Sequence, residues 1–121
     1  MNGVFDTNIL IDYLNGRAEA ATAISQRNDR IISRVTWMEV LVGVKPQDEQ
    51  AVRAFLGTFK IVEVSPAVSE EAVRIRKTVS KMKLPDAIIY ATAKTEGCDL
   101  ITRNTNDFDP TAPDVVAPYT I

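Results

Sequence analysis

The stretch that decides the fold is VFDTNILIDYLN, residues 4–15. It begins with two apolar residues, Val4 and Phe5, as a buried strand would, and it continues with the apolar spacing of a helix. Asp6 and Asn8 stand where the apolar run breaks. One explanation is local, because Asp, Thr and Asn oxygens accept hydrogen bonds from the free N–H groups that open a helix. The other is catalytic, and it requires further acidic residues that the fold brings to the same place.

The length and composition predict a single domain, residues 1–121. Of the 121 residues, 45% are hydrophobic, which is enough for one ordinary core. No apolar run approaches the roughly 20 residues of a membrane span, and the N-terminus lacks a basic stretch followed by an apolar one. We therefore expect a soluble, cytoplasmic protein without a membrane partner.

The chain contains no histidine and one cysteine, Cys98. These counts exclude Ser-His-Asp and Cys-His triads, imidazole bases and almost every zinc site. Any catalysis must therefore use carboxylates. The formal net charge of −2 argues against a protein that binds nucleic acid through a broad basic surface. Cations held by clustered acids would make the working charge less negative.

Short apolar runs alternate along the chain with longer stretches of helical spacing. The expected strands are residues 3–5, 30–35, 60–64, 98–102 and, more weakly, 115–117. The expected helices are residues 8–14, 18–27, 36–44, 47–59, 66–82 and 86–96. This alternation predicts an α/β fold, with three α/β/α layers around a mostly parallel central sheet of four to five strands.

Four acidic residues fall near one edge of the predicted sheet, beyond the carboxyl ends of the strands, where open parallel sheets bind ligands. Asp6 ends the first strand, and Glu39 lies in the helix after the second. Asp107 follows the strand that ends near Thr102, and Asp86 opens the helix that leads to that strand. Four separate helix caps have no reason to gather at one edge, so we interpret these acids as one site.

Two of these acids also have local explanations. Thr36 and Glu39 have the spacing of a capping box, in which Glu39 would bond back to the N–H of Thr36. Asp86 follows Pro85 in the first turn of its helix, where a negative charge gains about 0.3–1 kcal/mol from the helix dipole. However, Asp86 begins the run DAIIYATA, which is apolar nearly all round, as in a helix inside a protein. A carboxylate at the start of a buried helix requires a compensating charge.

Clustered carboxylates repel one another and stay ionised only when cations lie between them. Because no His or Cys ligand accompanies these acids, the expected cation is hard, Mg²⁺ or Mn²⁺. Such an ion lowers the pKa of a bound water, which could attack phosphorus without any histidine. The acids therefore predict metal-dependent chemistry at phosphate esters.

At these residues the sequence resembles the PIN domains, and among them the VapC-type toxins of bacterial and archaeal toxin–antitoxin pairs. Four motifs carry the resemblance along nearly the whole chain, in the family's order. FDTNILIDYL resembles the opening DTN/DTS motif, and SRVTWMEVLVG resembles the Ser/Thr-rich approach to a glutamate. LPDAIIYATA resembles the second aspartate helix, and LITRNTNDF resembles the closing TRN..DF motif.

The resemblance implies an endoribonuclease that depends on Mg²⁺ or Mn²⁺ and hydrolyses RNA phosphodiester bonds. It also implies a homodimer that is inhibited by a small cognate antitoxin similar to VapB. The acidic quartet that would bind the metal and perform catalysis is Asp6, Glu39, Asp86 and Asp107. The groups that would support this quartet or hold water are Asn8, Thr36 and Asn104.

The closing motif departs from the family pattern at Asn104, where some relatives have aspartate. The fourth acid is Asp107 or Asp109, and we favour Asp107 because it takes the motif position before phenylalanine. Asp12 and Asp99 are interpreted as solvated or turn residues without a role.

Arg103, beside the acidic loop, is the best single candidate for binding a substrate phosphate. The segment 74–83 is also basic, and Arg74, Lys77 and Lys81 share one face of the predicted helix. This face would either follow an RNA backbone towards the acids or simply contact solvent.

Two other classes of function remain open. One is a domain that keeps the fold but only binds a partner protein. The other is aspartyl phosphotransfer, as in phosphatases that open with D-x-D. It ranks well below, because Asn8 occupies the second acidic position and no lysine is suitably placed.

Overall fold

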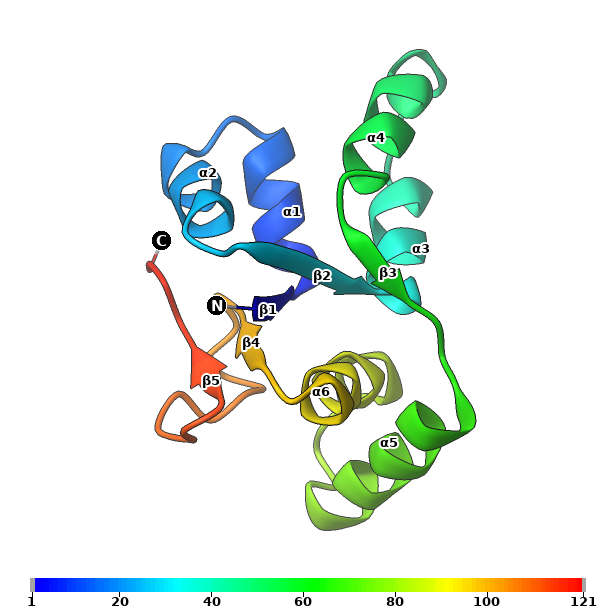
Figure 1. Ribbon diagram of the computed structural model, residues 1–121, viewed down its shortest axis with the longest axis vertical. Coiled ribbons are helices and arrows are strands. Elements are labelled where there is room, and N and C mark those ends of the chain that lie inside the picture. The colour runs from blue at the N-terminus through cyan, green and yellow to red at the C-terminus, as the bar shows by residue number, and fades with distance from the viewer. Residues whose placement is uncertain (1, 121) are drawn as a thin grey trace.

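The computed structural model describes residues 2–120, and a five-stranded sheet lies at its centre (Figure 1). The strands are β1 (Asn2–Phe5), β2 (Asp29–Ser33), β3 (Lys60–Val62), β4 (Asp99–Ile101) and β5 (Val115–Val116). They are ordered β3-β2-β1-β4-β5, and each neighbouring pair is parallel. The predicted α/β fold is therefore confirmed, with a sheet that is entirely parallel.

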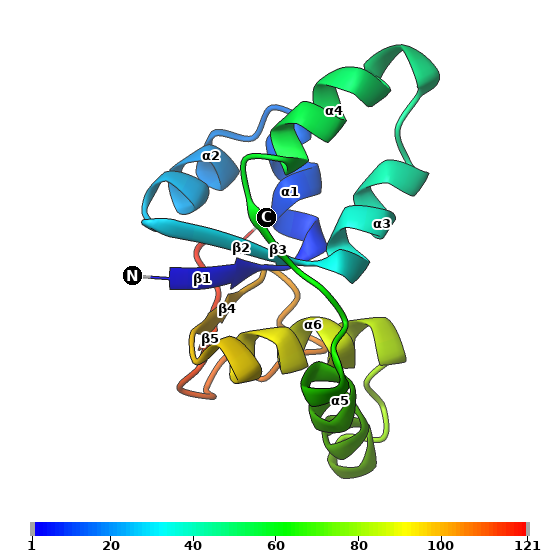
Figure 2. The ribbon, with the colours of Figure 1, turned by 45° about the vertical axis from the view of Figure 1, so that its right-hand side comes forward.

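Helices cover both faces of the sheet, as Figure 2 shows from a second direction. The helices on one face are α1 (Thr7–Leu14), α2 (Ala18–Ser25), α3 (Arg34–Val42) and α4 (Glu49–Leu56), with the 3₁₀ turn η1 (Pro46–Asp48) before α4. Those on the other face are α5 (Pro66–Thr78) and α6 (Leu84–Glu96). None of the helices within residues 2–120 has the length and apolar character needed to cross a membrane.

Consecutive residues of the central strands point to opposite faces of the sheet, and both faces are buried. Val4 belongs to the core beneath α5 and α6, whereas Phe5 belongs to the core beneath α1, α2, α3 and α4. Leu100 and Ile101 on β4 divide in the same way. Strands that are covered on both faces read as continuous apolar runs, which is why the sequence revealed them.

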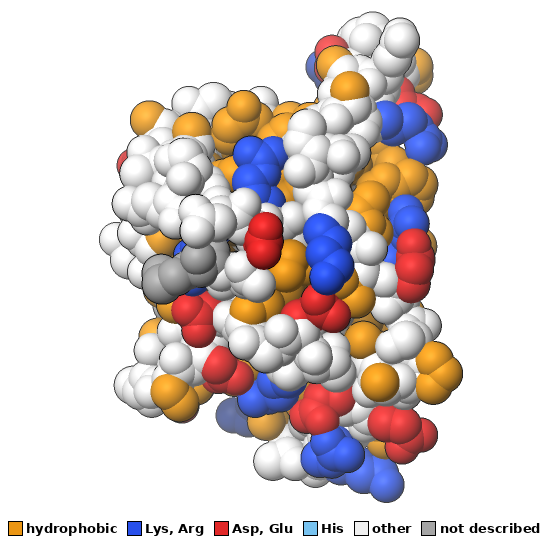
Figure 3. All heavy atoms as spheres, viewed as in Figure 1, with side chains coloured by type: hydrophobic (Ala, Val, Ile, Leu, Met, Phe, Trp, Pro, Cys, Tyr) orange, Lys and Arg blue, Asp and Glu red, His pale blue; other side chains and the backbone are white. Residues whose placement is uncertain are grey.

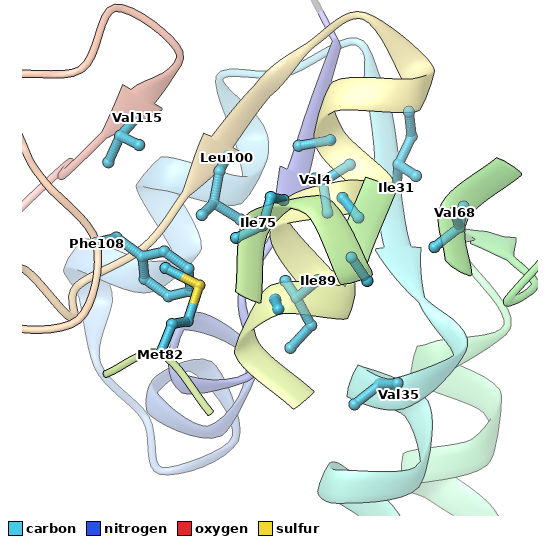
Figure 4. Packing of buried hydrophobic residues seen from close by; sticks show 14 residues of the cluster. Val4, Ile31, Val35, Val68, Ile75, Met82, Ile89, Leu100, Phe108 and Val115 are labelled. Atoms are coloured by element: carbon cyan, nitrogen blue, oxygen red, sulfur yellow. The ribbon is translucent and has the colours of Figure 1, made fainter. Parts of the chain in front are cut away.

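The core beneath α5 and α6 also fixes the loop that follows β4. Phe108 from this loop is 1% exposed and belongs to the cluster that contains Ile75 and Met82 (Figure 4). Its ring meets that of Tyr90 edge to face, with 5.7 Å between the centroids. Burying a phenylalanine stabilises the fold by about 1.5–3 kcal/mol, so the polar residues beside Phe108 are held at a defined place.

The start of α3 differs from its prediction, and the predicted capping box is wrong. α3 begins at Arg34 because Ser33 is its N-cap, whose hydroxyl accepts a hydrogen bond from the N–H of Val35 at 3.1 Å. Thr36 therefore lies inside the first turn and is fully buried. Since Thr36 is not the N-cap, Glu39 does not form a capping box with it.

The end of α5 also differs from its prediction. The helix ends at Thr78, and Lys81 lies in the connection to α6. The basic face predicted from Arg74, Lys77 and Lys81 is therefore wrong for its last member, since only the first two lie on the helix.

The chain direction brings several element ends to one edge of the sheet. α1 begins where β1 ends, and α3 begins where β2 ends. In Figure 2 the helix α6 runs against the direction of the strands, so its N-terminus reaches the edge to which the strand arrowheads point. The loop after β4 begins at this edge as well.

Candidate active site

Asp6 is the N-cap of α1, and capping uses only one of its two carboxylate oxygens. Oδ1 accepts a hydrogen bond from the N–H of Thr7 at 2.8 Å, which satisfies a free donor of the first turn. Oδ2 accepts hydrogen bonds from Asn8 Nδ2 at 3.1 Å and from the Thr102 hydroxyl at 2.8 Å. The local explanation for Asp6 is correct but incomplete.

The charge of Asp6 has no positive partner among the described residues. The side chain is 4% exposed, its three donors are neutral, and no ion pair within residues 2–120 includes it. Burial raises the pKa of Asp6 to about 6, and the charges of Asp86 and Glu39 add to the rise. A buried carboxylate in this situation favours a cation from outside the chain.

Glu39 reaches towards the same edge from the exposed side of α3. The Thr7 hydroxyl donates a hydrogen bond to Glu39 Oε1 at 2.6 Å. It also contacts the buried Thr36 hydroxyl at 3.1 Å. Thr36 thus supports the group that holds Glu39, which is a different role from the predicted helix cap.

Asp86 lies in the first turn of α6, as predicted, and is half-buried. The buried residues of the helix lie in its middle, between Ala87 and Ala93, which agrees with the apolar composition there. Burial raises the pKa of Asp86, as do the charges of Asp107 and Glu39, whereas Lys83 lowers it. Asp86 therefore lies within the electrostatic reach of two other acids of the predicted quartet.

The loop after β4 holds Asp107 through Asn104. The Asn104 side chain donates a hydrogen bond to Asp107 Oδ2 at 2.8 Å and accepts one from the Asp107 N–H at 3.2 Å. Asp109 instead accepts hydrogen bonds from the N–H and hydroxyl of Thr111, at 2.9 and 2.7 Å. The charge of Asp107 raises the pKa of Asp86, whereas Asp109 bonds within its own loop, so Asp107 stays our prediction for the fourth acid.

The four acids form a chain of mutual repulsion. The charges of Asp86 and Glu39 raise the pKa of Asp6, and the charges of Asp107 and Glu39 raise the pKa of Asp86. Within residues 2–120, however, no three His, Cys, Asp or Glu side chains are gathered closely enough to hold one ion. The donors fit Mg²⁺ or Mn²⁺ by their chemistry, because they are carboxylate oxygens and Asp6 lacks a cation in the chain.

Two hydroxyls to which the sequence analysis assigned no role contact the predicted acids. Thr102 donates to Asp6, and Thr7 donates to Glu39. The register of the sheet explains the first contact, because Phe5 pairs with Ile101 and the next residues along the two parallel strands are Asp6 and Thr102. This register depends on strand order, which the sequence alone did not give.

The interpretation of Asp12 as a solvated residue is wrong. Asp12 is 5% exposed and forms an ion pair with Arg103, with 2.7 Å between its Oδ2 and the Arg103 Nε. The partner lies 91 residues away in the sequence, so no local pattern could reveal it. Asp99 also pairs with an arginine, Arg27, at 3.2 Å.

The family model that matches the chain is the PIN domain, over residues 3–112. This chain belongs to the PIN-domain family. The predicted resemblance is therefore confirmed at the level of the family. No curated protein matches this PIN domain in sequence.

Solved structures resemble this PIN domain over its whole length. One is a toxin–antitoxin complex from Klebsiella pneumoniae, with 49% identity, a TM-score of 0.92 and coverage of 98% of this chain and 99% of that one. VapBC2 from Rickettsia felis, bound to a promoter DNA fragment, has 19% identity, a TM-score of 0.80 and coverage of 100% and 99%. VapBC-1 from nontypeable Haemophilus influenzae has 22% identity, a TM-score of 0.80 and 98% coverage of both chains. The last two show the shared fold, and the first shows close similarity in sequence as well.

Proposed function

We propose that this PIN domain is the toxin of a toxin–antitoxin pair, a cytoplasmic endoribonuclease that hydrolyses RNA phosphodiester bonds with Mg²⁺ or Mn²⁺. The observation that carries the proposal is the buried carboxylate of Asp6, which faces other acids and has no cation among residues 2–120. Such a site is stable when it binds a divalent cation, and a hard cation commonly takes phosphate oxygens as its remaining ligands.

Each predicted residue has a role in this proposal. The residues that would hold the cation are Asp6, Glu39, Asp86 and Asp107. Asn8 and Asn104 orient Asp6 and Asp107 by donating amide hydrogens to them. Thr36 supports the Thr7 hydroxyl that holds Glu39. The bound cation would supply an activated water and would stabilise the leaving oxygen.

Substrate binding must rely on particular cations of the chain, because its formal net charge is −2. On the face shown in Figure 3, acidic and basic side chains are interspersed. Arg103 remains our candidate for a phosphate ligand, since its side chain is 34% exposed and its backbone N–H donates to Asn8, a partner of Asp6.

The proposed partner is a small cognate antitoxin, as the similarity to the Klebsiella pneumoniae complex suggests. A groove of about 530 Å³ between α1, α3 and the η1–α4 segment offers it an apolar surface. Its lining includes Ile11, Leu14, Glu39, Val40, Val44 and Val52. Since Glu39 belongs to both the groove and the acidic edge, a bound antitoxin segment would cover part of the site. The resemblance also leads us to propose a homodimer.

One observation favours a second candidate function. Because no three acids within residues 2–120 are gathered at metal-binding distance, the domain could keep the fold and only bind its partner. Titration with Mn²⁺ separates the two, since a ligand at 100 times its Kd stabilises the folded state by about 2.7 kcal/mol. A catalytic site predicts a rise in melting temperature, and a domain that only binds a partner predicts none.

The decisive experiment compares Asp86→Asn with Asp109→Asn in purified protein freed of antitoxin. We expect Asp86→Asn to remain folded, to lose at least about 100-fold in Mn²⁺-dependent RNA cleavage, and to show a smaller Mn²⁺-induced rise in melting temperature. Asp109→Asn removes an equal charge from the loop after β4 and should cleave normally, because the Asp109 carboxylate accepts its hydrogen bonds from Thr111 in the same loop. Cleavage by Asp86→Asn at the wild-type rate would refute the proposal.

A further inference from the structure

Asp12 is a second buried carboxylate on α1, and two groups from distant parts of the chain donate hydrogen bonds to it. Arg103 donates from Nε to Oδ2 at 2.7 Å and from Nη2 to Oδ1 at 3.1 Å. The Tyr119 hydroxyl donates to Oδ2 at 2.7 Å. Both carboxylate oxygens are therefore bonded, and the pairing with Arg103 is bidentate.

The contact with Asp12 uses only one side of the Arg103 guanidinium. Asp12 bonds the edge formed by Nε and Nη2, and the Tyr119 hydroxyl lies beside the guanidinium because it bonds the same Asp12 Oδ2 that receives Nε. No hydrogen bond within residues 2–120 is donated by Nη1. A guanidinium carries five N–H donors in a planar fork. The edge formed by Nη1 and the second hydrogen of Nη2 therefore retains the geometry that binds a phosphate with two parallel hydrogen bonds.

The position of Arg103 links this pair to the acidic edge. Its backbone N–H donates to Asn8 Oδ1 at 3.2 Å, and Asn8 Nδ2 donates to Asp6 Oδ2. Asn8 and Asp12 are four residues apart, so they lie on the same face of α1 in successive turns. Arg103 thus contacts two successive turns of α1: its backbone N–H bonds Asn8, and its guanidinium bonds Asp12.

A free arginine side chain has many rotamers, and ordering it upon binding costs affinity. Asp12 is 7% exposed in its side chain, against 34% for Arg103, so the acid forms a buried anchor for a partly exposed cation. Tyr119 fixes the orientation of the anchor, because it bonds the same Oδ2 that receives the Arg103 Nε. Such an anchor would orient Arg103 before substrate arrives.

We infer that Asp12 and Tyr119 are positioning residues, which hold Arg103 so that its remaining edge binds a backbone phosphate of single-stranded RNA beside the acidic site. This inference rests on the proposed function, because it takes RNA as the substrate. It assigns a task to the C-terminal segment that carries Tyr119, which the sequence motifs do not include.

The test measures binding of a fluorescent single-stranded RNA to the intact Asp86→Asn protein at several salt concentrations, with electrophoresis to confirm that the RNA stays whole. Each phosphate contact to a single strand contributes about 0.7 to the slope of log K against log salt. We expect Arg103→Met to weaken binding about tenfold and to reduce the slope by about 0.7. Asp12→Asn should produce most of this change, and Tyr119→Phe a smaller part of it.

Matched controls break similar contacts elsewhere. Asp99→Asn removes the ion pair with Arg27, and Tyr90→Phe removes a hydroxyl that donates to Asp114 at 2.7 Å. Neither should alter the salt slope. If Asp12→Asn does not fold, Tyr119→Phe and Arg103→Met carry the test, with circular dichroism to confirm their structure.

A double variant separates positioning from general damage. Asp12→Asn should have no further effect on RNA affinity once Arg103→Met is present. Tighter binding by Asp12→Asn would mean that Asp12 competes with phosphate, and this result would overturn the inference. An unchanged salt slope in Asp12→Asn, or additive losses in the double variant, would overturn it as well. If the Asp86→Asn parent itself does not bind RNA, the proposed function fails first.

Discussion

Asp6 and Asp12 are two buried carboxylates, one at the N-cap of α1 and one in its last turn, and their surroundings are opposite. Asp6 is 4% exposed, has neutral hydrogen-bond donors and faces other acids. Asp12 is 5% exposed and is bonded by a guanidinium and a tyrosine hydroxyl. Arg103 neutralises the charge of Asp12, whereas no ion pair within residues 2–120 includes Asp6. Burial alone therefore does not indicate a site, whereas burial without a counter-charge does.

The pKa values express the same difference. Burial raises the pKa of Asp6 to about 6. Burial also raises the pKa of Asp12, but the hydrogen bonds from Arg103 and Tyr119 outweigh it, so that this pKa lies below its ordinary value. Folding therefore makes ionisation less favourable at Asp6 than in the unfolded chain, and more favourable at Asp12.

The largest expected effects separate the two acids: replacing Asp6 should mainly reduce catalysis, and replacing Asp12 should mainly reduce stability. Asp6→Asn should abolish Mn²⁺-dependent cleavage, by at least about 100-fold. Without metal at pH 7 it should change the free energy of unfolding little. Asparagine keeps the helix cap and removes the buried charge, which offsets the loss of the hydrogen bonds that Oδ2 accepts from Asn8 and Thr102. Asp12→Asn should lose about 1–2 kcal/mol of stability instead, allowing for the partial exposure of Arg103. Urea unfolding and RNA cleavage of both variants test the contrast, which fails if Asp6→Asn is the less stable of the two.

The pH dependence of stability should sharpen the comparison. Asp6 holds its proton more tightly in the folded protein than in the unfolded chain. Its favourable contribution to the free energy of unfolding is therefore present below about pH 3.8 and is lost as the pH rises through about 6. Relative to Asp6→Asn, the metal-free wild-type protein should therefore lose about 2–3 kcal/mol between pH 4 and pH 7. Asp12 should act in the opposite sense, because its pKa is lowered and its contribution is lost only as the pH falls below about 4.

The measurement is the free energy of unfolding of wild type, Asp6→Asn and Asp12→Asn from pH 3.5 to 7.5 in a chelating buffer. Saturating Mn²⁺ should remove the loss that the wild type suffers at neutral pH, since the cation stabilises the ionised form of Asp6. Parallel curves for wild type and Asp6→Asn would show that Asp6 titrates normally.

The smallest expected effect concerns the link from Thr7 to Glu39. Thr7→Val removes the hydroxyl that donates to Glu39 Oε1 at 2.6 Å, and we expect it to weaken Mn²⁺ binding about tenfold, as the loss of groups that orient metal ligands commonly does. Thr7→Ser keeps the hydroxyl and should restore the affinity. Thr95→Val, which removes a hydroxyl bonded within α6, is the control, and equal affinity for Thr7→Val and wild type would show that Glu39 needs no such support.

Local patterns were sufficient for most of the fold. The alternation of apolar runs with helical spacing predicted the parallel sheet, because the middle of a strand that is covered on both faces is mostly apolar. Boundaries were less accurate where two caps competed, as at Ser33 and Thr36. There Ser33, the last residue of β2, is the N-cap of α3, and Thr36 is buried.

The sequence by itself determined the α/β architecture, the family and the positions of acids near strand ends, because periodicity and motif spacing are local properties of the chain. Only the tertiary structure decided which carboxylates have counter-charges. Asp12 lies 91 residues from Arg103 and 107 from Tyr119, while Asp6 meets Thr102 only because β4 is the parallel neighbour of β1. Electrostatic interactions act through space and depend on burial, so their sign at each acid follows from the packing of distant segments.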